Sequence, residues 1–154
     1  MALRFNHMEL TFSPGTLTAE FRREVDSVFV DILGWRAVDA DVVGQHTHIL
    51  LPDDGQFILL AEGKKWMDSP GYDHLGFLLE SREEVDDVLT SLEKFASTDE
   101  RMRIKRYDDL VTGNLTVHAF YFKFLLPIWF DVQCLEHAPG HAPKRAWQYV
   151  ATQP

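Results

Sequence analysis

The sequence predicts an α+β fold made of two tandem βαβββ modules. The order strand, helix, strand, strand, strand occurs once before residue 66 and once after residue 72. Part of the helical sequence also recurs, because "REVDSV" at 23–28 matches "EEVDDV" at 83–88, an offset of 60 residues. Each module also begins with a strand that carries a histidine, His7 or His74. Together these observations indicate one supersecondary unit that occurs twice.

The first module, about residues 3–66, is predicted from alternation, helical periodicity and turn residues. "FNHMELTF" at 5–12 alternates in part and is followed by Ser-Pro-Gly, so it is predicted to be a strand. Apolar residues then recur at helical spacing from Thr18, which caps a predicted amphipathic helix that stops at Gly34. Three further strands, separated by turn residues, are predicted at 36–43, 46–51 and 56–62.

The second module, about residues 72–136, repeats this order. "HLGFLLES" at 74–81 is a predicted strand, and Ser81 is a potential cap for the helix that follows. Three more strands are predicted at 102–107, 116–124 and 128–135. Residues 137–154 are rich in Pro and Ala and are predicted to form a tail along the surface of a single domain.

Composition limits the classes of partner. Of 154 residues, 15 are Lys or Arg and 24 are Asp or Glu, so the net charge of −9 argues against a nucleic-acid-binding protein. No apolar run approaches the ~18 residues of a membrane-spanning helix, and the N-terminus lacks the apolar core of a signal peptide. The single cysteine, Cys134, excludes an internal disulfide, and we expect a cytoplasmic protein.

Strand alternation places three potential metal ligands on one side of the sheet. In the last strand the apolar residues at 130, 132 and 134 are expected to face the helices, so Asp131 points away from them. The same alternation places His7 and His74 on the non-helix face of their strands. Two imidazoles and a carboxylate can bind a divalent metal (Fe, Mn, Zn or Ni) and leave positions for substrate or O₂.

Structural roles remain open for these residues. A single strand histidine is more often a core or rim residue than a ligand. Asp131 has potential ion-pair partners in Arg103, Lys105 and Arg106. Glu9 shares the face of His7 and is either a hydrogen-bond partner of a ligand or an exposed side chain.

Other residues are predicted to line the same cup. His118 and His48 are candidates for acid–base catalysis near a bound oxygen, and Tyr121 is a third catalytic candidate. The predicted substrate pocket comprises Glu9, Trp129, Gln133 and Phe120.

Several short motifs, in this order, resemble the vicinal oxygen chelate superfamily: "FNHMELTF", "DILGW", "DHLGFLLES" and "HAFYFKF". This superfamily includes glyoxalase I, extradiol dioxygenases, fosfomycin-resistance enzymes, epimerases and bleomycin-resistance proteins. The resemblance covers about residues 3–136. It implies a half-open, cup-shaped mixed β-sheet with helices on the outer face, and a homodimer.

The resemblance also implies the same metal ligands, His7, His74 and Asp131. The usual Asp-Pro-Asp-Gly turn before the last ligand is replaced here by Phe-Leu-Leu-Pro at 124–127, and the usual glutamate by the shorter Asp131. The fourth ligand of glyoxalase I-like members falls on Leu59, so it is absent. This difference favours a dioxygenase-like or other metal enzyme over glyoxalase I.

Three functions follow as alternatives. The first is a metal-dependent dioxygenase, lyase or isomerase that chelates vicinal oxygens of a small molecule. The second is a metal-free protein of the bleomycin-resistance type that sequesters a small cationic molecule, which suits the charge of −9 and the tryptophans Trp35, Trp66, Trp129 and Trp147. The third is an interaction domain whose ancestral site has decayed.

Overall fold

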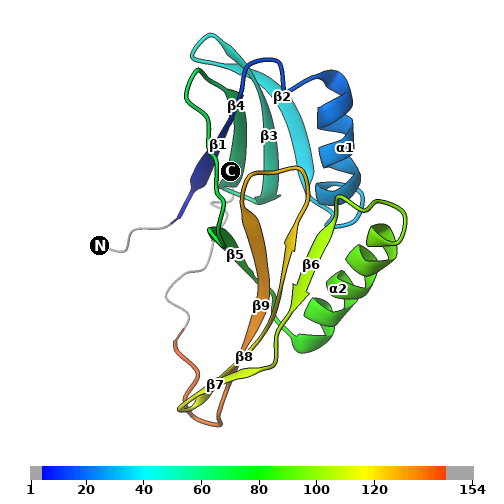
Figure 1. Ribbon diagram of the computed structural model, residues 1–154. Coiled ribbons are helices and arrows are strands. Elements are labelled where there is room, and N and C mark those ends of the chain that lie inside the picture. The colour runs from blue at the N-terminus through cyan, green and yellow to red at the C-terminus, as the bar shows by residue number, and fades with distance from the viewer. Residues whose placement is uncertain (1–4, 145–154) are drawn as a thin grey trace.

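The computed structural model describes residues 5–144, and it has the predicted α+β fold (Figure 1). Two mixed β-sheets, one from each module, carry both helices on the same side. The first sheet has the strand order β1-β4-β3-β2, with β1 (His7–Phe12), β2 (Arg36–Val42), β3 (Gln45–Asp53) and β4 (Gln56–Glu62). The second has the order β5-β9-β8-β6, with β5 (His74–Leu78), β6 (Arg103–Arg106), β8 (Leu115–Lys123) and β9 (Trp129–His137).

The second module contains one element more than the sequence predicts. The short strand β7 (Leu110–Thr112) pairs with β8 beyond the end of β6. All three of its residues are exposed, so no alternation of buried and exposed positions marks it.

Each sheet contains one parallel pair, β1 with β4 and β5 with β9, and its other pairs are antiparallel. The parallel pairs have matching registers, since His7 lies opposite Phe57 and His74 opposite Trp129. The first strand of each module therefore occupies the same position in its sheet. In both sheets it lies beside the last strand of its module.

Both helices begin at the predicted caps. Before α1 (Ala19–Phe29), the Thr18 hydroxyl accepts a hydrogen bond from the backbone N–H of Phe21. Before α2 (Arg82–Ala96), Ser81 and Glu84 form a reciprocal capping box. These bonds satisfy backbone N–H groups that have no partner within a helix. α1 ends at Phe29, and Gly34, with φ of 73°, lies in the turn that follows.

Substitution Ser81→Ala is expected to lower the free energy of unfolding by about 1 kcal/mol, because it leaves a backbone N–H of the first turn without its acceptor. Urea unfolding followed by far-UV circular dichroism measures the loss. Ser91→Ala is the matched control, since Ser91 lies on an exposed position inside the same helix, and within residues 5–144 its hydroxyl bonds only to the Asp87 carbonyl. An equal loss in both variants would contradict a capping role for Ser81.

The core lies between the sheets and the helices and joins the two modules. Phe29 at the end of α1 contacts Phe122 and Phe130 of the second sheet. Trp35 of the first module contacts Phe77 of β5. No helix in residues 5–144 is long and apolar enough to cross a membrane.

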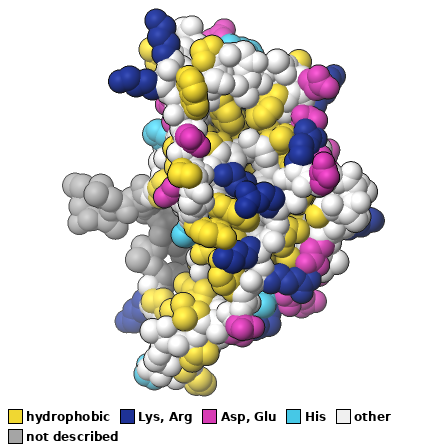
Figure 2. All heavy atoms as spheres, in the orientation of Figure 1, with side chains coloured by type: hydrophobic (Ala, Val, Ile, Leu, Met, Phe, Trp, Pro, Cys, Tyr) yellow, Lys and Arg dark blue, Asp and Glu magenta, His cyan; other side chains and the backbone are white. Residues whose placement is uncertain are grey.

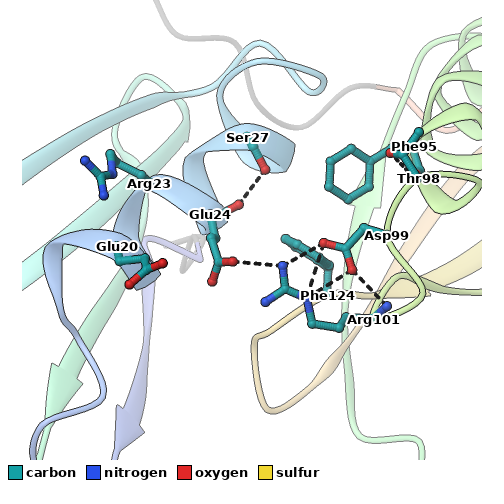
Figure 3. A pocket seen from close by; sticks show the side chains of 9 residues that line it. All are labelled: Glu20, Arg23, Glu24, Ser27, Phe95, Thr98, Asp99, Arg101 and Phe124. Atoms are coloured by element: carbon teal, nitrogen blue, oxygen red, sulfur yellow. Dashed lines mark hydrogen bonds and ion pairs between the residues drawn. The ribbon is translucent and has the colours of Figure 1, made fainter.

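An open cavity of about 450 Å³ marks the junction of the modules on the helix side (Figure 3). It lies between α1 and the segment that follows α2. Arg101 donates hydrogen bonds across it to Glu24 and, on its own side, to Asp99. These ion pairs join the two modules, and the cavity does not include the predicted metal ligands.

Candidate metal-binding site

Asp131 lies at the centre of the second sheet, on the face away from the helices. Strand pairing places it between Tyr121 of β8 and Gly76 of β5. Its side chain is only 6% exposed, and among the described residues its Oδ1 atom has no hydrogen-bond partner. An unpaired carboxylate oxygen is costly to bury unless a cation compensates it. The chemistry of this atom therefore suits a metal ligand.

The surroundings of Asp131 have opposite effects on its pKa. Burial raises the pKa, whereas the Tyr121 hydrogen bond and the nearby His74 lower it, and the net shift is upward. A bound divalent cation would favour the ionised carboxylate in the same place.

Gly76 leaves space beside the carboxylate. A Cβ atom at this position would lie 3.4 Å from Gln133 Nε2 and 4.0 Å from Asp131 Oδ2. A larger side chain would extend from there over the face that carries Asp131. The glycine therefore keeps this side of the carboxylate open.

His74 is oriented as a metal ligand requires. Its Nδ1 lies 2.8 Å from the carbonyl oxygen of Tyr72, which can only accept, so Nδ1 carries the proton. In the neutral ring Nε2 then has a free lone pair, the usual arrangement of a histidine ligand. The ring also packs edge-on against Tyr121, with centroids 5.0 Å apart. His74 and Asp131 thus lie on adjacent strands and share Tyr121 as a neighbour.

His7 also has a hydrogen bond at Nδ1 and an aromatic ring against it, but it belongs to the other sheet. Its Nδ1 lies 2.8 Å from Asn6 Oδ1, and its ring stacks on Phe57 with centroids 4.6 Å apart. The side chain is exposed. Within residues 5–144, however, no three His, Cys, Asp or Glu side chains approach closely enough to hold a metal ion. Of the three predicted ligands in residues 5–144, His74 and Asp131 lie on adjacent strands of one sheet, and His7 lies on the other sheet.

The first module lacks a counterpart of Asp131. Leu59 lies opposite Glu9 of β1, two residues after His7, just as Asp131 lies opposite Gly76, two residues after His74. Leu59 is buried and cannot ligate a metal. The register agrees with the expectation that the fourth ligand position is filled by leucine.

The structure corrects the expected positions of His48, His118 and Phe120, which all lie on the helix side of their sheets. His48 is 4% exposed, with Nε2 2.8 Å from Asp26 Oδ1 of α1 and Nδ1 2.8 Å from Asp39 Oδ1. Phe120 is 1% exposed and lies in the core. These side chains do not reach the face that carries Asp131, so they have no part in the proposed site.

His118 connects its sheet to α2. Its Nε2 lies 2.9 Å from Asp86 Oδ1 and its Nδ1 lies 2.8 Å from Asp109 Oδ1. Arg82 pairs with the same Asp109 at 2.7 Å. The first module contains the same residue types, since Arg22 lies 3.3 Å from Asp39, which also binds His48. We call these sets the first polar link (Arg22, Asp26, Asp39, His48) and the second polar link (Arg82, Asp86, Asp109, His118).

The second polar link predicts a pH-dependent contribution to stability. Burial lowers the pKa of His118, but the hydrogen bonds to Asp109 and Asp86 outweigh burial and raise it above its usual value. Because the folded-state pKa is the higher one, the contribution is fully present below the unfolded value of about 6.5 and is lost as pH rises through the folded value.

His118→Gln is expected to remove this part of the pH dependence, which urea unfolding at a series of pH values would detect. His46→Gln is the control, because His46 is exposed and, among the described residues, pairs only with Asp41 on the surface. If the wild type and His118→Gln lose stability in parallel as pH rises, the assignment is wrong.

The other residues predicted to line the site differ in their position and exposure. Tyr121 holds Asp131, and Trp129 and Gln133 lie on the same strand face as Asp131. Trp129 is 4% exposed and is covered by Tyr72, whose ring stacks on it at 5.4 Å. Glu9 is exposed on β1 and accepts a hydrogen bond from Thr11. Trp147 lies outside the described residues.

Comparison with known proteins gives a result for structure and none for sequence. No family model matches the sequence, and no curated protein matches it. The fosfomycin resistance protein FosX from Listeria monocytogenes matches with a TM-score of 0.60 and 18% identity, over 90% of this chain and 93% of that one. A putative glyoxalase family protein from Bacillus anthracis matches with a TM-score of 0.60 and 10% identity, over 87% and 96%.

A second FosX structure from Listeria monocytogenes contains ligands. It is a mutant form of that protein complexed with Mn(II) and 1S,2S-dihydroxypropylphosphonic acid. It matches with a TM-score of 0.59 and 19% identity, over 90% of this chain and 91% of that one. These likenesses concern the arrangement of helices and strands. The chain has the fold of the vicinal oxygen chelate superfamily, which FosX and glyoxalase-family proteins share.

Proposed function

We propose that the protein is a metal-dependent enzyme whose substrate chelates a divalent metal through vicinal oxygens. The observation that carries this proposal is the buried Asp131 Oδ1, which lacks a partner among the described residues and lies beside the oriented imidazole of His74. The Mn(II) in the Listeria FosX structures supports a divalent metal in this fold. When bound, the metal would act as a Lewis acid toward the substrate oxygens.

The side chains around the site have distinct roles in this proposal. Tyr121 donates to Asp131 and holds its carboxylate in one orientation. Burial and the charge of Asp131 raise the pKa of Tyr121, so its hydroxyl keeps the proton at neutral pH. The carbonyl of Tyr72 fixes the His74 ring, and the buried Trp129 limits the access of water from the neighbouring position on β9.

The third ligand, His7, would come from a second copy of the chain. The site is incomplete within residues 5–144 of one chain, and both His7 and His74 are exposed. Large apolar side chains are also exposed on the same non-helix faces: Val38 in the first sheet, and Leu78, Leu110 and Leu135 in the second. A homodimer that places the first sheet of one copy against the second sheet of the other would cover them and complete two equal sites.

The first experiment measures the metal content of untagged protein by elemental analysis, as purified and after reconstitution with Mn(II), Fe(II), Zn(II) or Ni(II). Near-stoichiometric metal is expected in the wild type and in His46→Ala, which changes an exposed surface histidine. His74→Ala is expected to lose the metal. Absence of metal from the wild type under all these conditions would contradict the proposal.

A mixing experiment tests the shared site. His7→Ala and His74→Ala are each expected to bind no metal alone. When the two variants are unfolded and refolded together, mixed dimers contain one intact site, so metal binding is expected to return in part. If each variant keeps its own behaviour after mixing, the site does not lie between two chains.

A metal-free binding protein of the bleomycin-resistance type is the alternative function. Aromatic residues around Asp131, including Tyr72, Tyr121 and Trp129, suit a pocket that binds a small molecule without a metal. This alternative would be favoured if the protein bound a small molecule but contained no metal after reconstitution.

A further inference from the structure

His74 is supported on two sides by groups from different parts of the second module. The Tyr72 carbonyl lies 2.8 Å from its Nδ1, and the Tyr121 ring packs edge-on against it with centroids 5.0 Å apart. Tyr121 belongs to β8, whereas Tyr72 belongs to the segment between β4 and β5. The orientation of His74 therefore depends on how firmly these two supports are held relative to each other.

Lys105 of β6 connects the two supports. Its Nζ lies 4.1 Å from the ring centre of Tyr72 and 4.9 Å from that of Tyr107. Tyr107 in turn packs edge-on against Tyr121, with centroids 5.0 Å apart. The contacts therefore lead from His74 through these side chains and back to His74. We call this set the aromatic cluster (Tyr72, Lys105, Tyr107 and Tyr121).

A cation suits this connecting position because it attracts the faces of two rings at once. Within residues 5–144 Lys105 forms no ion pair, whereas the next side chain but one on the strand direction that faces the helices, Arg106, pairs with Glu93. Hydrogen bonds to Tyr107 and Tyr72 raise the pKa of Lys105, so it stays charged at neutral pH. On the face shown in Figure 2, basic side chains lie among hydrophobic ones over the middle of the molecule.

The segment that carries Tyr72 needs side-chain contacts to hold it, because residues 63–73 contain no helix or strand. Its last residue, Asp73, is tied to β9, since its carbonyl accepts a hydrogen bond from the Trp129 N–H at 2.9 Å. The Tyr72 ring is 52% exposed, and it stacks on Trp129 with centroids 5.4 Å apart. Contacts with neighbouring side chains, rather than burial, therefore hold the Tyr72 carbonyl in place.

We propose that the aromatic cluster orients His74 before any metal binds, and that Lys105 is a positioning residue that acts through Tyr72 and Tyr107. This inference rests on the proposed function, because it assigns the residues that prepare one ligand of the same site. Every member of the cluster lies at residues 72–121, so His74 is oriented within one chain, before a second copy supplies His7. A ligand that is already oriented binds a metal more tightly, because less rotational freedom is lost on binding.

The tautomer of His74 in the metal-free protein tests the positioning, since the Tyr72 carbonyl requires the proton on Nδ1. Long-range proton–nitrogen NMR spectra of the histidine rings, assigned with His74→Ala, are expected to show the Nδ1–H form in the wild type and in Tyr72→Phe, which keeps the ring. Tyr72→Ala and Lys105→Gln are expected to show a mixture of both tautomers. The His7 signals are the internal control and are expected to stay unchanged, because His7 lies on the other sheet. If His74 keeps the Nδ1–H form in either variant, the cluster does not position it.

The affinity for Mn(II) separates positioning from charge. Lys105→Gln removes a positive charge near the site, which by electrostatics alone would strengthen the binding of a cation. Lost positioning instead weakens binding, and we expect a loss of roughly tenfold, typical of a group that orients a metal ligand. Lys105→Arg keeps a cation beside the rings and is expected to bind like the wild type. Lys123→Gln is the charge-matched control on the same face of the sheet, and no loss is expected. Unchanged or stronger Mn(II) binding by Lys105→Gln would overturn the role of Lys105.

The two measurements keep this inference apart from the proposed function. If the wild type binds no Mn(II) but the tautomer of His74 depends on Lys105 and Tyr72, the proposed enzyme is wrong and the cluster still orients His74. If Mn(II) binds equally well to the wild type, Tyr72→Ala and Lys105→Gln, only the positioning is wrong.

Discussion

Asp131→Asn is expected to abolish metal binding and, at the same time, to stabilise the metal-free protein. The wild-type carboxylate is buried, and its Oδ1 has no partner among the described residues. A neutral amide of the same shape avoids the cost of burying a charge and can still accept the Tyr121 hydrogen bond. We expect a gain of about 1 kcal/mol in the free energy of unfolding without metal.

Addition of Mn(II) is expected to reverse the order of stability. A metal that binds only the folded state stabilises the wild type in proportion to the logarithm of its concentration, whereas the variant gains nothing. Urea unfolding with a chelator and with Mn(II) measures both effects. Asp41→Asn, a change at an exposed carboxylate, serves as the control. A variant that is destabilised without metal would show that Asp131 has a purely structural role.

Phe130→Ala is expected to produce the largest loss of stability, about 3–5 kcal/mol. The ring is fully buried and contacts Phe29, Phe77 and Phe122 at centroid distances of 5.2, 5.9 and 5.3 Å. Because Phe29 belongs to the first module, the resulting cavity would weaken the contact between modules as well as the second sheet. Asp131 is the next residue on β9, so metal affinity is expected to fall too.

Urea unfolding and Mn(II) titration measure the two consequences. Phe130→Leu keeps most of the buried volume and is expected to lose much less stability. Phe5→Ala changes a ring that is 56% exposed and is expected to have a small effect. A loss below about 1 kcal/mol for Phe130→Ala would show that the core closes around the missing ring.

Local patterns were enough to predict most of the fold. The caps Thr18 and Ser81 fixed where the helices begin, because each supplies a specific hydrogen-bond acceptor to the first turn. In β9, apolar side chains at alternate positions face the helices, so Asp131 between them faces the other side of the sheet. The offset of 60 residues between the two helical motifs revealed the repeat.

Sequence alternation failed where both faces of a strand carry apolar residues. In β8, Val117, Ala119 and Tyr121 share one face, while Phe120 and Phe122 share the other with His118. The alternation grouped the residues of each face correctly, but it did not show which face packs against the helices. The repeated helical motif contained the missing signal, because its aspartates, Asp26 and Asp86, are the residues that bind His48 and His118.

The position of His7 relative to Asp131 was also beyond sequence reasoning. Each residue is placed within its own sheet by local alternation. Their separation, however, depends on how the two modules pack, through contacts such as Phe29 with Phe130 that are distant in the chain. No local pattern encodes that packing.

The two polar links have a consequence for how such a protein can evolve. Every member of the first link lies in the first module and every member of the second link in the second. Each helix is therefore anchored by polar contacts to strands of its own half of the gene. A duplication, a recombination or an exchange of halves between two chains keeps both anchors intact, and selection can then alter the opposite sheet faces independently.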